Sequence, residues 1–107
     1  MYVTTRVLKM EKGHKDSFIT RFNQPFVLQS FDGFVKREVL IDERNKTYDL
    51  YRISVYFDSR QAYINWEGSE THKAMHQNSN GHKKEMPGLI EASRETFHEL
   101  VTLYKNE

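Results

Sequence analysis

The chain has 107 residues, of which 37% are hydrophobic and 29% are charged, a balance typical of a single folded globular domain. Its 16 Lys and Arg residues nearly balance 15 Asp and Glu residues, so a net charge of +1 provides no field that would gather nucleic-acid phosphates. The absence of cysteine excludes disulfides, zinc-thiolate sites and cysteine nucleophiles. We therefore expect one domain over residues 1–107 that does not bind nucleic acid.

No stretch of the sequence has the pattern of an export signal or a membrane span. The N-terminal residues MYVTTRVLKMEKG lack the apolar run of a signal peptide, and nowhere do 18 apolar residues follow one another. A chain without cysteine also suits a reducing compartment. These features predict a soluble, cytoplasmic protein with no membrane partner.

The first half of the sequence predicts a strand, a helix and a hairpin. Residues 2–10 are rich in β-branched and long apolar types and end at a Lys-Gly turn signal, which predicts a strand. Residues 14–24 have apolar positions at helical spacing until Pro25 forbids continuation. Two further runs, 33–42 and 48–57, flank a polar turn and predict the two strands of a hairpin.

Two short helical pieces are expected next. Asp58 and Gln61 have the Asp-x-x-Gln spacing of a capping box and predict a helix start. Gly68 interrupts the pattern, and Ser69 is suited to cap a second piece over residues 70–77.

The last part of the chain predicts a loop and a final strand. Residues 77–88 are polar and rich in turn formers, whereas residues 93–105 contain enough β-branched and aromatic types for a strand, with a helix as the competing interpretation. The resulting order β-α-β-β-α-β predicts an α+β fold of the ferredoxin-like type.

Both faces of the predicted strands carry apolar residues, although helices cover only one face of such a sheet. Burying the second face requires more protein than one chain offers, so we expect a homodimer that packs sheet against sheet. The clearest case is the strand over 48–57, which places Tyr51, Ile53, Val55 and Phe57 on one face and Leu50 and Tyr56 on the other.

The segment INWEGSETHKAMHQN contains the only tryptophan, Trp66, together with His72 and His76. Trp66 suits a core or an interface, and a lone histidine near a helix end most often caps it or lies on the surface. His72 and His76 share a helix face, but no acidic residue stands beside either and no third ligand is evident, which disfavours a zinc site.

The spacing from Trp66 to His76 allows a different interpretation. Ten helical residues span about 15 Å, and a kink at Gly68 would direct both side chains into one groove. An aromatic ring at one end and an imidazole at the other suit a broad planar ligand bound through a central metal. Neutral imidazole is the usual proximal ligand of haem iron.

The sequence resembles the Isd-type haem-degrading monooxygenases of the antibiotic biosynthesis monooxygenase superfamily. The resemblance extends over nearly the whole chain and depends on an ordered set of marks. These are Lys12-Gly13, Arg21-Phe22, the Phe31-Asp32-Gly33-Phe34 run, Asn65-Trp66, Ser69, Lys73 and His76.

This resemblance implies a dimeric α+β barrel in which each subunit binds one haem as both substrate and cofactor. His76 would be the axial ligand of the haem iron, and Trp66 would distort the porphyrin. O2 and an external electron donor, supplied by a reductase, would open the ring and release iron. We also expect the loop over 77–88 to lie beside the pocket.

One position departs from the family pattern. The best-known members carry an asparagine as a distal hydrogen-bond donor seven residues before the glycine that ends strand one, where this chain has Arg6. Arginine also donates hydrogen bonds, so Arg6 is a candidate catalytic residue, but it is longer and always charged. It would equally suit a haem propionate or a salt bridge across the sheet.

Two other functions remain open at the level of sequence. Some members of the superfamily oxidise aromatic phenols without a cofactor, and the aromatic residues here would serve that chemistry. A non-enzymatic haem-binding or stress protein would need the same axial ligand as the oxygenase.

Overall fold

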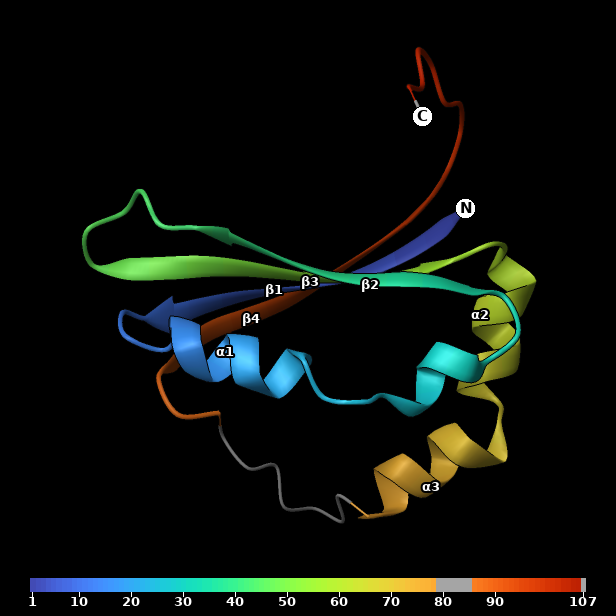
Figure 1. Ribbon diagram of the computed structural model, residues 1–107, viewed down its shortest axis with the longest axis horizontal. Coiled ribbons are helices and arrows are strands. Elements are labelled where there is room, and N and C mark those ends of the chain that lie inside the picture. Colours follow the sequence, from blue (N-terminus) through green and yellow to red (C-terminus); the bar gives the residue numbers. More distant parts are fainter. Residues whose placement is uncertain (79–85, 107) are drawn as a thin grey trace.

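The computed structural model describes residues 1–78 and 86–106, except for the side chains of residues 75–78. The strands and helices follow the order β-α-η-β-β-α-α-β along the chain (Figure 1). The elements are β1 (Tyr2–Glu11), α1 (Lys15–Phe22), the 3-10 helix η1 (Val27–Ser30), β2 (Phe34–Asp42), β3 (Tyr48–Phe57), α2 (Arg60–Glu67), α3 (Glu70–Asn78) and β4 (Leu89–His98).

The strands of the described residues form one antiparallel sheet in the order β2-β3-β1-β4. The helices lie on one side of this sheet, and the chain after β4 leaves it on the opposite side (Figure 1). The predicted α+β ferredoxin-like fold is therefore confirmed. No described helix has the length and apolar character needed to cross a membrane.

The two helices after the hairpin differ in how well their starts were predicted. The expected capping box at Asp58 is wrong, because α2 begins one residue later and Ser59 is its N-cap, with Oγ accepting a hydrogen bond from the Ala62 N–H at 3.1 Å. The break at Gly68 is confirmed, and Ser69 caps α3 by accepting a hydrogen bond from the His72 N–H at 3.1 Å.

The final strand lies earlier in the chain than predicted. β4 begins at Leu89 and ends at His98, and neither a strand nor a helix follows among the described residues up to 106. The physical reason is register: His98 pairs with Tyr2, the first residue of β1, so beyond it no neighbouring strand offers hydrogen bonds.

The core lies between the sheet and the helices in two clusters. In the first, the Phe18 ring of α1 stacks on Tyr51 of β3 with centroids 3.9 Å apart, above Leu8 and Met10. The second cluster packs α2 and η1 against the end of β3. It comprises Leu28, Phe57, Ala62 and Trp66.

A glycine at the start of β2 allows α2 to approach the sheet closely. Gly33 has a φ of +88°, and a Cβ there would lie 2.4 Å from the Ala62 Cβ. Any other residue would strain the backbone and push α2 away from the sheet. This close approach fixes the position of the helix that carries Trp66.

Candidate functional site

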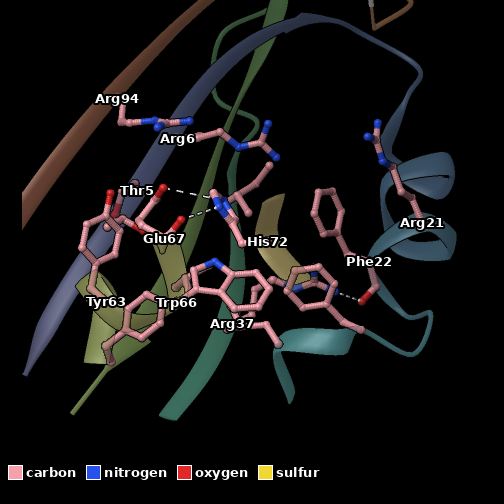
Figure 2. Close-up of a pocket in the computed structure, with 16 residues that line it drawn as sticks. Thr5, Arg6, Arg21, Phe22, Arg37, Tyr63, Trp66, Glu67, His72 and Arg94 are labelled. Carbon is pink, nitrogen blue, oxygen red and sulfur yellow. Dashed lines mark hydrogen bonds and ion pairs between the residues drawn. The ribbon is translucent and has the colours of Figure 1, made fainter. Parts of the chain in front are cut away.

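A cavity of about 510 Å³ opens between the helix-covered face of the sheet and the helices. Its volume lies in the range of sites that hold a drug-sized or cofactor-sized molecule. Figure 2 shows Arg6, Arg21 and Arg94 along one side of the pocket and the Trp66 indole, with Arg37 near it, on the other. The apolar lining comes from Phe22, Phe26, Leu28, Ile53, Val55, Phe57 and Trp66.

Trp66 belongs both to the core and to the pocket wall. Its side chain is only 6% exposed and packs in the second core cluster. The indole makes edge contacts with Phe31, at a centroid distance of 5.2 Å, and with His72, at 5.1 Å. The core role and the pocket role considered from sequence are thus compatible, because one edge of a large ring is fixed by packing while another lines the cavity.

His72 is the histidine whose side chain the structure places in this pocket. Its Nδ1 lies 3.1 Å from the Glu67 carbonyl oxygen, and its Nε2 lies 3.6 Å from the Glu67 carboxylate. The break at Gly68 turns α3 relative to α2, which lets His72 meet both Trp66 and Glu67. Sequence reasoning gave His72 no functional role and did not single out Glu67.

Tyr63 extends this polar group along α2. Burial raises the pKa of Tyr63, and a hydrogen bond with the Glu67 side chain raises it further. Tyr63 therefore stays protonated as a neutral phenol at neutral pH, with its hydroxyl directed toward a carboxylate that also faces His72. The group can hold or pass a proton at the side of the pocket beside Trp66.

Arg6 of β1 lines the same cavity, together with Arg21 of α1, Arg37 of β2 and Arg94 of β4. Desolvation by the surrounding protein lowers the pKa of Arg6, and the positive charges of the other arginines lower it further. Among the described residues, no carboxylate forms an ion pair with Arg6, so the cross-sheet salt bridge considered from sequence is not formed.

His76, the predicted axial ligand, lies in α3, but its side chain is outside the described part of the structure. Residues 79–85 of the predicted loop also lie outside it. The proposed role of His76 and the placement of this loop beside the pocket therefore stay predictions.

The fold and the pocket define a ferredoxin-like α+β protein with an aromatic, arginine-rimmed cavity under one face of its sheet. A family profile described as antibiotic biosynthesis monooxygenase matches residues 1–78, and the chain belongs to this family.

Known proteins of similar sequence and structure agree with this assignment. A "Heme-degrading monooxygenase" from Halalkalibacterium halodurans is 27% identical over 100 residues, which cover 94% of this chain and 82% of the relative. Two solved structures share the fold, each at 18% identity. One, described as a "Putative Antibiotic Biosythesis Monooxygenase from Bacillus cereus", has a TM-score of 0.78, and the match covers 97% of both chains. The other, the heme degrader MhuD from Mycobacterium tuberculosis with two hemes in its active site, has a TM-score of 0.66 and covers 97% of this chain and all of MhuD.

Proposed function

We propose that the chain is a haem-degrading monooxygenase that binds haem in the pocket beside Trp66 and opens the porphyrin with O2 and external electrons, releasing iron. The observation that carries this proposal is the cavity itself, which has aromatic walls, is about 510 Å³ in volume, and lies in a chain whose relatives include proteins named for haem degradation. A flat apolar ring fits against Trp66, Phe22 and Phe26, which lie on three different elements.

Each pocket residue has a proposed role. His76 would hold the iron, as the family resemblance implies; it belongs to α3, the helix that directly follows the one carrying Trp66. Trp66 would distort the ring by contact. Its indole is held rigidly, because its other side packs in the second core cluster and against Phe31. Arg6 lies across the cavity and donates hydrogen bonds from β1.

When bound, haem supplies the iron centre at which O2 is activated. The protein orients the ring and keeps water from its apolar faces, and the Tyr63–Glu67–His72 group provides a path for protons. Electrons come from a reductase, which is a transient partner in this proposal.

A homodimer completes the proposed assembly. The sheet face that carries no helices exposes apolar side chains, among them Leu40 at 52% and Phe97 at 62% exposure. Leu40 pairs with Arg52 and Phe97 pairs with Val3 in the sheet register. Side chains alternate between the two faces along a strand, and these positions alternate with the ones that face the core, so they point to the helix-free face. A second copy burying this face would give the dimeric barrel of the family, in a cytoplasmic protein.

A haemin titration tests the proposal. The wild-type protein should develop a Soret band at a stoichiometry of one haem per chain, and His76→Ala should weaken binding at least about tenfold. His98→Ala, at an exposed position of β4, is the matched control and should bind like the wild type. A titration that responds equally to both substitutions would refute the assignment of His76.

Turnover is tested on the same complex. Adding ascorbate or a reductase in air should bleach the Soret band and release iron to a ferrous chelator. A stable spectrum would mean that the protein stores or senses haem without degrading it. Turnover of an aromatic phenol by a protein that does not bind haem would instead favour cofactor-independent oxidation.

A further inference from the structure

The Trp66 indole is held at its edges by two other rings. The centroid of Phe31, which precedes β2, lies 5.2 Å from that of the indole at an interplanar angle of 72°, and the centroid of His72 on α3 lies at 5.1 Å and 62°. Edge-to-face contacts of this kind stabilise one relative orientation of two aromatic rings. The tilt of the indole therefore depends on two segments that are far apart in the sequence.

One hydroxyl group ties the backbone of Trp66 to that of His72. Ser69 Oγ donates a hydrogen bond to the Trp66 carbonyl oxygen at 2.7 Å and accepts one from the His72 N–H at 3.1 Å. Because α2 ends at Glu67 and α3 begins at Glu70, this bridge spans the break between the two helices. It fixes the two backbones relative to each other at the point where both side chains line the pocket.

Glu67 holds the His72 ring in one orientation. Nδ1 lies 3.1 Å from the Glu67 carbonyl oxygen, an atom that only accepts hydrogen bonds, so Nδ1 carries a hydrogen and donates it. Nε2 lies 3.6 Å from the Glu67 carboxylate. Turning the imidazole over would exchange its nitrogen and carbon positions and lose both contacts. His72 therefore presents a defined edge to the indole.

We propose that His72 is a positioning residue that sets the tilt of the Trp66 indole in the pocket, and through it the orientation of a bound ring. The two side chains lie next to each other in the pocket wall (Figure 2). A ring that packs against the indole takes its orientation from this tilt, since a close-packed contact tolerates few arrangements. This inference rests on the proposed function, because it names the residue that controls how Trp66 meets the ring.

The single tryptophan of the chain allows the indole to be observed without a ligand. Near-UV circular dichroism, recorded at wavelengths where tyrosine does not absorb, should show a strong Trp66 band in the wild type. His72→Ala should lose most of this band, because one edge of the indole is then free to move. His72→Phe should recover the band in part, since it restores an aromatic edge without the contacts to Glu67. His72→Gln should not recover it, because a flexible amide replaces the ring.

The orientation of a bound ring is measured on the haemin complex. Haemin is unsymmetrical, so a ring turned over in the pocket gives a second set of haem methyl signals in the NMR spectrum. The wild type should show one predominant set. Loss of the edge contact in His72→Ala should raise the second set relative to the first by about two- to tenfold. This measurement needs no turnover.

Thr71→Ala is the matched control, because Thr71 directly precedes His72 on α3, is exposed, and lies outside the lining of the cavity. It should keep both the Trp66 band and the ratio of methyl sets. An unchanged band in His72→Ala would overturn the inference, and so would a band that His72→Gln keeps and His72→Phe loses. Far-UV circular dichroism checks that each variant is folded; if His72→Ala is not, the comparison of His72→Gln with His72→Phe decides.

The inference and the proposed function fail separately. If the wild type does not bind haemin, the proposed function is refuted, whereas the Trp66 band of the unliganded protein still decides whether His72 positions the indole. If haemin is bound and degraded but the Trp66 band and the methyl ratio are the same in the wild type and in His72→Ala, the proposed function stands and the positioning role of His72 is refuted.

Discussion

Lys12 and Asp49 form an ion pair that is partly removed from solvent. The Asp49 side chain is 6% exposed, and Lys12 Nζ lies 2.5 Å from its Oδ1 and 3.1 Å from the Glu43 carbonyl oxygen. Lys12→Met leaves a buried carboxylate without its cation, so it should lower the free energy of unfolding by about 1–3 kcal/mol. Urea denaturation at neutral pH measures the change.

Lys15 provides the comparison for this prediction. It pairs with Glu43 at 2.7 Å, but both side chains are about half exposed. Water screens such a pair, so Lys15→Met should lower the free energy of unfolding clearly less than Lys12→Met does. If the two substitutions have equal effects, the burial of Asp49 does not control the strength of its ion pair.

The residues of the pocket differ in how far sequence could identify them. Trp66 was singled out because it is unique and stands at a family-like spacing, and the structure places it on the pocket wall. Glu67, Tyr63 and Arg94 were missed, because their meeting depends on the helix break and on the β1–β4 register, which no local pattern encodes. The sequence therefore indicated which residue types could serve a pocket, but not which of these residues would meet in space.

At the scale of elements, the two serine caps after the hairpin predict different consequences. Ser59→Ala removes the N-cap of α2 and should cost about 1 kcal/mol of stability, with little effect on the pocket because α2 is anchored by core residues. Ser69→Ala removes the cap of α3, so the first turn of that helix should fray.

Haemin affinity distinguishes these two variants. Because α3 carries His72 and His76, Ser69→Ala should weaken haemin binding several-fold, whereas Ser59→Ala should leave it within about twofold of wild type. Hydrogen exchange at the start of α3 measures the fraying directly. Equal losses of affinity in the two variants would show that α3 is not a distinct determinant of the site.

In the β2–β3 hairpin, the contact between Asp42 and Arg44 should make the stability of the protein depend on pH. Hydrogen bonds from the Arg44 side chain and then from its backbone N–H lower the pKa of Asp42 to about 2. Because the folded pKa is depressed, the contact contributes stability above the ordinary value of 3.8 and loses it as the pH falls through about 2. In Arg44→Gln, the pKa of Asp42 should rise toward 3.8 but stop short of it, since the backbone hydrogen bond is kept.

Carboxyl carbon NMR of Asp42 measures this titration. A midpoint that is unchanged by Arg44→Gln would assign the whole pKa shift of Asp42 to the backbone N–H.

The turn between β2 and β3 could be predicted from the sequence, because polar residues separate two alternating apolar runs. β4 was placed too late in the chain because its limits are set by pairing with β1, and residues 99–106 have strand-like composition without a partner strand.

For the whole molecule, the helix-free face of the sheet predicts association. Phe97 is 62% exposed on this face, and the chain after β4 leaves on the same side of the sheet (Figure 1). Leu100, Val101, Leu103 and Tyr104 follow it, all more than 60% exposed. Apolar surface of this extent is uncommon in a monomer, and a two-fold symmetric dimer buries the same patch on each copy.

Sedimentation velocity should therefore find a dimer at micromolar concentration. Phe97→Lys should convert the dimer to monomers, because it would bury one unpaired lysine from each copy in the interface. Ile64→Lys is the matched control, because Ile64 is also exposed, at 44%, but lies on α2 on the opposite side of the sheet. It should leave the dimer intact. A wild type that sediments as a monomer, or a dimer broken only by Ile64→Lys, would place the interface elsewhere and contradict the sheet-to-sheet assembly.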